Sequence, residues 1–297
     1  MAVHTYLQSI EKAGRGRRER KAVASSDGGG GGGGLRNTHC SASVPENSKD
    51  MASLVDFKQA ITKDPSGVLN SWNTSMPFCQ WMGVACSRRH PGRVAALQLG
   101  GQSLTGILTP SLGNLTFLRA LNLSSNYFSG HLPHLQHLYR LEVLDLSSNL
   151  LQGVIPDTLT NCSNLRSIHL AYNFLEGEIP LNVGLLPELS TLYLSENNLT
   201  GTIPPTLNNT RLRVIALANN KLTGGIPYEL GSLDLFILYL GGNMLSGGFP
   251  FPLLFNLSYL GGLDLGMNML GGELPSYIGD VLPNLQVLVL GGNMFAD

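Results

Sequence analysis

Apolar and polar positions recur in one short pattern along most of the chain. The pattern reads apolar, any residue, apolar, two further residues and then Asn, as in Leu121-x-Leu123-x-x-Asn126 and Leu192-x-Leu194-x-x-Asn197. The last position of the pattern is occupied in turn by Gln102, Asn126, Asn149, Asn173, Asn197, Asn220, Asn243, Asn268 and Asn293. Because these residues lie 23 to 25 positions apart, the nine copies in phase indicate a repeat architecture.

Each position of the repeat predicts a structural role. The alternating apolar pair is typical of a half-buried strand, and strands of successive repeats would stack about 4.8 Å apart in one parallel sheet. An Asn side chain both donates and accepts hydrogen bonds, so a column of Asn residues can satisfy turn backbone groups from one coil to the next. The period is that of a leucine-rich repeat, which predicts an α/β-type solenoid with a parallel concave sheet.

A second pattern lies between the strands. Gly follows four residues after the Asn position in eight of the repeats. In seven of these an apolar residue and Pro then end the segment, as at Ile203-Pro204, whereas the first repeat has its Pro displaced by one residue. The stretch Leu199-Thr200-Gly201-Thr202-Ile203-Pro204 resembles the extracellular repeats of plant receptor-like kinases. That resemblance implies a short second strand in each coil and a twisted superhelix.

The segment before the repeats resembles the N-terminal cap of plant leucine-rich repeat receptors. Met51–Leu69 places Leu54, Val55, Phe57 and Ile61 on one helical face, and a turn at Asp64–Gly67 interrupts it. The resemblance continues through Ser71-Trp72-Asn73 and the stretch from Cys79 to Cys86. It implies that the helix and a Cys79–Cys86 disulfide close the first open end of the solenoid.

The stretches Gly92-Arg93-Val94 and Ser111–Leu118 are similar to the receptor subfamily that perceives bacterial patterns. The resemblance covers roughly residues 49–297 and says nothing about the ligand. We predict three regions: a disordered basic and poly-Gly arm at 1–48, a cap at 49–92, and about nine repeats at 93–297 with the last one incomplete.

The first region has its own chemistry. Arg15–Lys21 is basic and favours nuclear import or nucleic-acid binding only as a minor alternative, and Gly28–Gly34 is a flexible tract without a phosphate-loop Lys. No apolar run typical of a signal peptide or a transmembrane helix is found in the sequence. We therefore expect this chain to be an ectodomain fragment, truncated before the membrane-spanning and kinase regions of a longer protein.

The charge and the glycosylation sequons favour an extracellular setting. The net charge is −1 and only 13% of residues are charged, so the repeats do not indicate a nucleic-acid surface. Candidate N-glycosylation sites are Asn73, Asn114, Asn122, Asn161, Asn198, Asn208 and Asn256. By resemblance, the predicted location is the outer side of the plasma membrane.

The sequence carries no strong catalytic or metal-binding pattern. The spacing of His131, His134 and His137 gives a weak zinc candidate, because no Cys or carboxylate stands nearby at ligand spacing. Kinase motifs and a Gly-x-Ser-x-Gly elbow are missing from the sequence. Cys162 is interpreted as a small buried residue. We expect no enzyme activity in this chain, no metal and no cofactor.

The sequence places the binding surface on the concave sheet. His169, Tyr193 and Tyr239 belong to the column four residues before each Asn, and Tyr172 and Glu196 immediately precede an Asn. Aromatic residues are enriched where binding energy is concentrated, so these five are the predicted ligand-binding residues. The small Ala216 between Tyr193 and Tyr239 predicts a shallow slot for a ligand side chain.

Three functions remain open. The leading one is a receptor ectodomain for a peptide or a pathogen pattern, which signals through a kinase and a co-receptor with a leucine-rich repeat ectodomain. The second is a secreted binding protein similar to polygalacturonase inhibitors, although that family is expected to have further cysteine pairs. The third, an enzyme, is disfavoured because no catalytic constellation was found.

Overall fold

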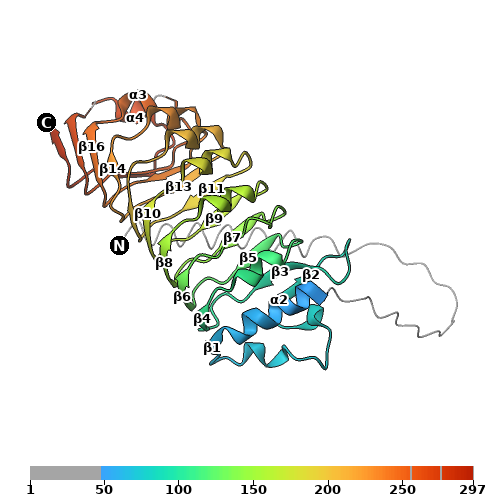
Figure 1. The fold of residues 1–297 in the computed structure, drawn as a ribbon. Helices are drawn as coiled ribbons and strands as arrows, with labels where there is room; N and C mark the ends of the chain where they lie inside the picture. Colours follow the sequence, from blue (N-terminus) through green and yellow to red (C-terminus); the bar gives the residue numbers. More distant parts are fainter. Residues whose placement is uncertain (1–47, 255, 275, 297) are drawn as a thin grey trace. The chain divides into compact units, whose positions relative to one another are not determined.

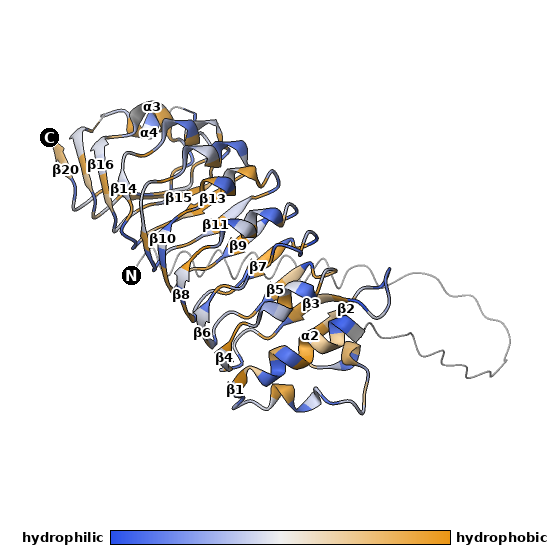
Figure 2. Cartoon of the chain, in the orientation of Figure 1, coloured by the Kyte–Doolittle hydropathy of each residue, from blue (hydrophilic) through white to orange (hydrophobic). Residues whose placement is uncertain are grey.

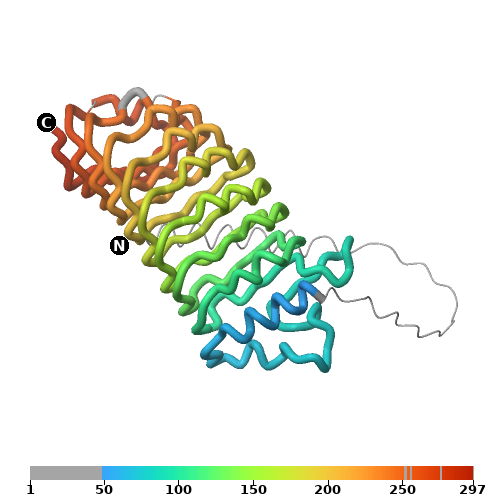
Figure 3. The backbone as a smooth tube through the Cα atoms, in the orientation of Figure 1, coloured from blue at the N-terminus to red at the C-terminus, as the bar shows by residue number. Residues whose placement is uncertain are grey.

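The protein is described by a computed structural model that covers residues 48–254, 256–274 and 276–296. These residues belong to one compact unit, Val44–Asp297. Figures 1 and 3 show one coil of chain stacked on the next from the cap to the last repeat. The arm predicted at 1–48 lies outside the described residues except for its last position, so its state stays a prediction.

The predicted strands form a main sheet, ten-stranded within the described residues, in the order β19-β17-β15-β13-β11-β9-β7-β5-β3-β2. Neighbouring repeat strands pair in parallel and in register, as where Leu192 stands opposite Ile215. The strands are β2 (Val84–Cys86), β3 (Val94–Gln98), β5 (Ala120–Asn122), β7 (Val143–Asp145), β9 (Ser167–His169), β11 (Thr191–Tyr193), β13 (Val214–Ala216), β15 (Ile237–Tyr239), β17 (Gly262–Asp264) and β19 (Val287–Val289). The parallel leucine-rich repeat solenoid predicted from the sequence is confirmed.

Each coil also carries the second strand that the family resemblance implied. These strands are β4 (Thr105–Ile107), β6 (Tyr127–His131), β8 (Leu150–Val154), β10 (Phe174–Glu178), β12 (Asn198–Thr200), β14 (Thr223–Gly224), β16 (Met244–Gly248), β18 (Met269–Glu273) and β20 (Met294–Ala296). In the described chain they form a six-stranded sheet with β1 and a separate four-stranded sheet from β14 onward. A single bridge between Thr202 and Thr223 joins the coils where the two sheets part.

Short helices complete the coils on the side away from the main sheet. They are the 3-10 helices η3 (Pro110–Asn114), η4 (Asp157–Asn161), η5 (Leu181–Leu185), η6 (Pro205–Asn209) and η7 (Tyr228–Ser232), and the α-helices α3 (Phe251–Leu254) and α4 (Ile278–Val281). Pro precedes or begins most of these turns, where its fixed φ and missing N–H cost nothing.

The cap closes both sheets with antiparallel strands. Helix α2 (Ser48–Gln59) is followed by β1 (Ile61–Lys63), the 3-10 helices η1 (Val68–Ser71) and η2 (Phe78–Gln80), and then β2. Strand β1 pairs with β4, and β2 pairs with β3. The helix is shorter than the sequence suggested, because the β-branched Ile61 and Thr62 belong to a strand that satisfies the edge of the second sheet.

The predicted disulfide joins Cys79 to Cys86. Beside it, the rings of Trp72 and Trp81 stack with centroids 5.2 Å apart, and both side chains are buried. The indole N–H of Trp72 donates to the Met82 carbonyl at 2.9 Å. The disulfide therefore closes a loop that holds an aromatic cluster against the first repeats.

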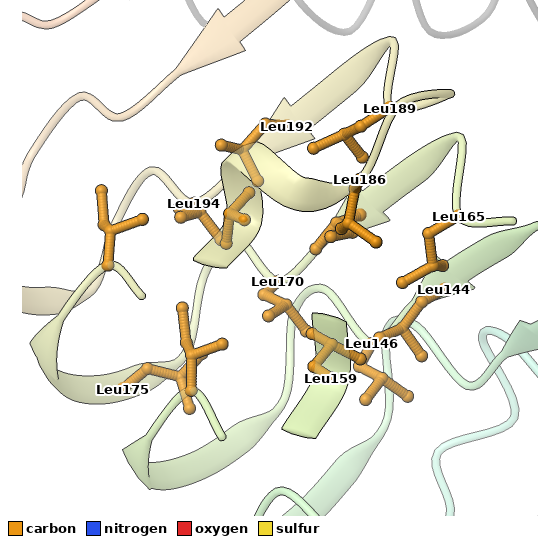
Figure 4. Close-up of a cluster of buried hydrophobic side chains, with 14 of the residues drawn as sticks. Leu144, Leu146, Leu159, Leu165, Leu170, Leu175, Leu186, Leu189, Leu192 and Leu194 are labelled. Atoms are coloured by element: carbon orange, nitrogen blue, oxygen red, sulfur yellow. The ribbon is translucent and has the colours of Figure 1, made fainter. Parts of the chain in front are cut away.

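The core is a continuous column of leucines between the sheets and the short helices. Figure 4 shows side chains such as Leu170, Leu186 and Leu194 meeting from successive coils. Figure 2 shows that each coil carries both hydrophobic and hydrophilic stretches. Since each coil buries its leucines against its neighbours, stacking supplies most of the stability.

The ladder Asn residues have the predicted role. In the fifth repeat, Nδ2 of Asn197 donates to the carbonyls of Leu170 (3.1 Å) and Leu194 (3.0 Å), and its Oδ1 accepts the N–H of Leu175 (2.9 Å). The same bonds recur at Asn149, Asn173, Asn220, Asn243 and Asn268. Each Asn side chain therefore ties its own turn to the preceding coil.

Candidate functional site

The column of residues four positions before each ladder Asn does not form the ligand patch predicted from the sequence. Tyr239 is fully buried and Tyr193 is only 8% exposed, so the expectation that both rings are offered to a ligand is wrong. Ala216, which pairs with both in the sheet, is also fully buried, so there is no slot between them. At a strand spacing of about 4.8 Å, a large ring bends over the smaller residues of the neighbouring coil and covers them.

The other predicted residues divide into two places. The half-buried His169 ring contacts Tyr193 edge-on, with centroids 4.7 Å apart, and its Nε2 lies 2.9 Å from the Ser167 hydroxyl. Tyr172 and Glu196 follow their strands in the left-handed region, each with φ of 58°. The structure thus joins His169 to Tyr193 at the carboxyl ends of β9 and β11, and it places Tyr172 and Glu196 in the turns that follow these strands.

Tyr172 and Glu196, which form a rim beside the main sheet, both make hydrogen bonds to the next coil. Tyr172 is 39% exposed, and its N–H donates to the Ser195 carbonyl of the next coil at 3.0 Å. The Glu196 carboxylate accepts a hydrogen bond from the Asn219 amide at 2.6 Å. These side chains are accessible, and their roles as ligand contacts stay predictions.

A pocket lies at the opposite end of the strands. It encloses about 560 Å³ and is lined by Ser190, Thr191, Arg213, Val214, Asp234, Phe236 and Tyr259. Phe236 is 40% exposed and Tyr259 is 63% exposed, so both rings offer apolar surface to a ligand. The exposed Arg213 and Asp234 add one charge of each sign. The site can therefore hold an apolar side chain and bind polar groups beside it.

A glycine makes room for this pocket. A Cβ built on Gly261 would lie 3.0 Å from the Phe236 ring, which shows that the ring rests against the backbone of the next coil. The ring is thus supported on one side and open to solvent on the other. An aromatic ring supported in this way provides a rigid contact at a small entropic cost.

Five of the seven pocket residues occupy two positions of the repeat, nine and seven residues before the ladder Asn, which together define what we name the lateral face. The other two, Thr191 and Val214, stand six residues before it. The position nine before is occupied by Phe117, Arg140, Asn164, Glu188, Arg211, Asp234, Tyr259 and Asn284. The position seven before is occupied by Arg119, Glu142, Arg166, Ser190, Arg213, Phe236, Gly261 and Gln286. Sequence reasoning missed this face, although Phe236 and Tyr259 next to Gly261 were the signal for it.

Burial shifts the pKa of two groups, Asp264 in strand β17 and Cys162 directly after η4. Burial raises the pKa of the Asp264 carboxyl, and the Gly266 N–H that it accepts at 3.0 Å partly opposes that shift. Burial also raises the pKa of the Cys162 thiol to about 12, so this cysteine is no nucleophile at neutral pH. Its thiol instead donates to the Leu135 carbonyl at 3.2 Å, which agrees with the structural role predicted for it.

The described residues hold no group of three or more His, Cys, Asp or Glu side chains placed to bind a metal ion. Of the predicted histidines, His134 contacts the Thr158 hydroxyl at 2.9 Å and His137 packs edge-on against Tyr139. No helix in the described ranges is both long and apolar enough to cross a membrane.

The sequons occupy different surroundings. Asn114 and Asn161 end 3-10 helices, and Asn256 follows α3; all three are exposed. Asn122 lies in strand β5, where its Oδ1 accepts hydrogen bonds from the Ser124 N–H and hydroxyl. The exposed sequons Asn73, Asn114, Asn161 and Asn256 thus differ from the partly buried Asn122, Asn198 and Asn208.

Family models match the chain in both of its described parts. A model described as "Leucine rich repeat N-terminal domain" matches residues 47–87. Leucine-rich repeat models match residues 117–138, 133–175, 188–210 and 211–233. The cap and the repeats therefore each carry a recognised signature.

The proteins similar to this chain include plant receptor kinases. The LRR receptor-like serine/threonine-protein kinase EFR of Arabidopsis thaliana is 50% identical over 88 residues, which is 29% of this chain and 8% of that protein. The chain thus aligns with less than a tenth of this relative's length.

Two crystal structures from Arabidopsis cover most of the chain. The ectodomain of the membrane receptor kinase GASSHO1/SCHENGEN3, solved with Casparian strip integrity factor 2, is 37% identical with a TM-score of 0.77, covering 83% of this chain and 30% of that one. The ectodomain of the receptor kinase HAESA, solved with an IDA peptide hormone ligand, is 35% identical with a TM-score of 0.74, covering 83% of this chain and 42% of that one.

Proposed function

Because this chain belongs to the leucine-rich repeat ectodomains of plant receptor-like kinases, we propose that it binds a peptide in the lateral-face pocket. The observation that carries the proposal is the pair of exposed rings, Phe236 and Tyr259, beside Arg213 and Asp234 in one pocket of about 560 Å³. The rings would bind an apolar side chain of the peptide, and the two charged groups would fix its orientation.

The repeats supply a rigid platform for such a ligand. The main-sheet strands under the pocket pair in register from β11 to β17, and their turns are tied by ladder Asn side chains. A site on regular strands needs little ordering when a ligand binds, which favours affinity. His169, Tyr172 and Glu196 remain proposed contacts for a longer ligand that crosses the sheet.

Peptide or pathogen-pattern perception would then be transmitted by the kinase of a longer protein, on the inner side of the plasma membrane. A co-receptor with a leucine-rich repeat ectodomain is the proposed partner in that step. A secreted inhibitor-like binding protein is the alternative. Genomic sequence downstream of residue 297 would decide between them, because only the receptor continues into an apolar span and kinase motifs.

The binding proposal is tested with a random dodecapeptide library displayed on phage and selected on the purified chain. We expect enriched peptides with an aromatic or large aliphatic residue, and a loss of binding of about tenfold or more in the Phe236→Ala, Tyr259→Ala double variant. Both side chains are exposed, so the variant should keep its fold.

Tyr228→Ala is the matched control, because Tyr228 is 74% exposed but lies on η7, away from the pocket. Its affinity for the same peptides should equal that of the parent chain. Full affinity in the double variant, or a library without enriched peptides, would refute the pocket as a peptide site.

A further inference from the structure

We propose that the lateral face beside the cap binds an acidic group of the peptide through Arg140, whose guanidinium is held on the ring of Phe117. This inference rests on the proposed peptide-binding function and adds the chemistry of the ligand. The ligand would carry a carboxylate or another oxyanion at a set distance from the apolar residue that occupies the pocket.

A tight turn brings the cap loop into contact with Phe117. The Arg93 N–H donates to the His90 carbonyl at 3.2 Å, with Pro91 and Gly92 between them and a φ of 76° at Gly92. Pro followed by a residue with positive φ is the signature of a type II turn. This turn connects β2 to β3 and places His90 and Arg93 on the ring of Phe117.

Three side chains surround the Phe117 ring. The guanidinium carbons of Arg93 and Arg140 each lie 4.0 Å from its centroid. Two planar groups so close to one centroid would overlap on a single face, so the arginines lie on opposite faces. The His90 ring packs against Phe117 in a T-shaped contact, with centroids 4.8 Å apart.

The two arginines differ in how their charge is balanced. Nε of Arg93 lies 3.1 Å from Oδ2 of the fully buried Asp50, and a terminal nitrogen donates to the Thr116 hydroxyl at 2.8 Å. Asp50 also accepts the Val94 N–H at 2.8 Å, so this pair joins α2 to the first repeat strand. Arg93 is therefore committed to the fold.

The charge of Arg140 is not balanced in this way. In the described part of the chain no carboxylate forms an ion pair with it, and its recorded contact is the face of Phe117. A guanidinium stacked on a ring still has its in-plane N–H donors available, and stacking reduces its freedom before a ligand binds. Such a group is suited to bind a carboxylate, sulfate or phosphate in a bidentate manner.

The charges around Arg140 favour an anion. Glu142 is paired with Arg119, and Asp50 is paired with Arg93, so both nearby carboxylates are already matched. The remaining arginines of the cap loop and of the lateral face have no ion pair within the described ranges: Arg88, Arg89 and Arg166 near the cap, and Arg213 in the pocket. An acidic ligand would therefore meet a surplus of positive charge here.

The repeat geometry sets the spacing of the ligand groups. Arg140 lies four coils from Phe236 and five coils from Tyr259 on the same face, which corresponds to about 19–24 Å at the strand spacing. An extended peptide advances about 3.3 Å per residue, so its acidic residue should lie about six to seven positions from its apolar residue. Exposed Asn164 and the Glu188–Arg211 pair lie along the path.

The phage selection is repeated on Arg140→Gln and on the matched control Arg211→Gln, which removes an arginine from the same column but beyond the basic region. On the parent chain and on the control, we expect Asp or Glu to be enriched about six to seven positions from the apolar residue. On Arg140→Gln that enrichment should vanish while the apolar preference remains. Apolar enrichment without any acidic preference on the parent chain would overturn this inference and leave the pocket proposal standing.

A second measurement uses inorganic sulfate, which needs no peptide. At constant ionic strength, sulfate should raise the Tm of the parent chain and of Arg211→Gln in a saturable way, and should do so about tenfold more weakly in Arg140→Gln. Equal responses in all three proteins would overturn the anion site. If trigalacturonate binds at Arg140 while the selected peptides lack acidic residues, the site belongs to a polysaccharide, and the peptide inference is refuted.

Discussion

The ring of Tyr239 covers Gly262 of the next strand: a Cβ built on that glycine would lie 2.7 Å from the tyrosine hydroxyl oxygen and 2.9 Å from a ring carbon. The relationship explains why a tyrosine on the outward side of a sheet is fully buried. It also makes Gly262 a residue whose size, and not its backbone freedom, matters to the fold.

We predict that Gly262→Ala destabilises the protein by about 1–3 kcal/mol, because the methyl group would push a packed ring out of its place. Urea unfolding followed by tryptophan fluorescence measures the change. Gly248→Ala is the control, since a Cβ there meets nothing within 4 Å. Equal stability of the two variants would show that Tyr239 moves freely.

The comparison of Tyr239 with Asn197 shows what the sequence could and could not predict. The role of Asn197 follows from its own repeat, because the position, the turn and the bonding partners recur in the coils from Asn126 onward. The burial of Tyr239 depends on which residue the next coil carries beside it, and a single repeat contains no such information. The pocket has the same origin, because Phe236, Gly261 and Tyr259 come from different coils.

Replacing Asn197 by Ala should lower the free energy of unfolding by about 1–3 kcal/mol, because buried backbone groups of Leu170, Leu194 and Leu175 lose their hydrogen-bond partner. Thermal unfolding of this variant beside Asn198→Ala gives the measurement. Asn198 is its partly exposed neighbour in the chain and has no part in the ladder. Should both variants melt together, the ladder would not carry stability.

The carboxyl of Asp264 should make stability depend on pH. Its pKa is raised in the folded state, so the folded protein holds the proton more tightly than the unfolded chain does. The ionised, buried group therefore destabilises the fold at neutral pH, and this penalty falls away as the pH drops through the raised pKa toward the ordinary value of 3.8.

Asp264→Asn should remove that dependence, because an amide oxygen can still accept the Gly266 N–H without a charge. The difference in unfolding free energy between variant and parent should favour the variant at pH 7 and shrink on acidification. The check is urea unfolding at several pH values between 4 and 7.5. A difference that stays constant across this range would contradict the burial argument.

The last prediction concerns which sequons carry a glycan on the secreted, folded protein. Asn114, Asn161 and Asn256 are exposed, and each precedes a residue that turns into the core: Leu115, Cys162 or Leu257. Their side chains point away from that core, so a glycan there would extend into solvent. Asn122 instead lies in a main-sheet strand, bonded to Ser124 and close to Gly100 of the previous coil. We expect the first three sites to be occupied and Asn122 to be unmodified.

The measurement is enzymatic release of the glycans in heavy-oxygen water, followed by mass spectrometry of the peptides. Asn161→Gln should lower the mass of the secreted protein by one glycan, whereas Asn122→Gln should leave its glycan content unchanged. Because Asn161 lies on η4 and not on the lateral face, its glycan should leave the pocket open, and enzymatic removal should not alter peptide affinity. A glycan found on Asn122 of the folded protein would mean that the main sheet opens enough near the cap to accommodate a sugar, which its close contacts in this structure argue against.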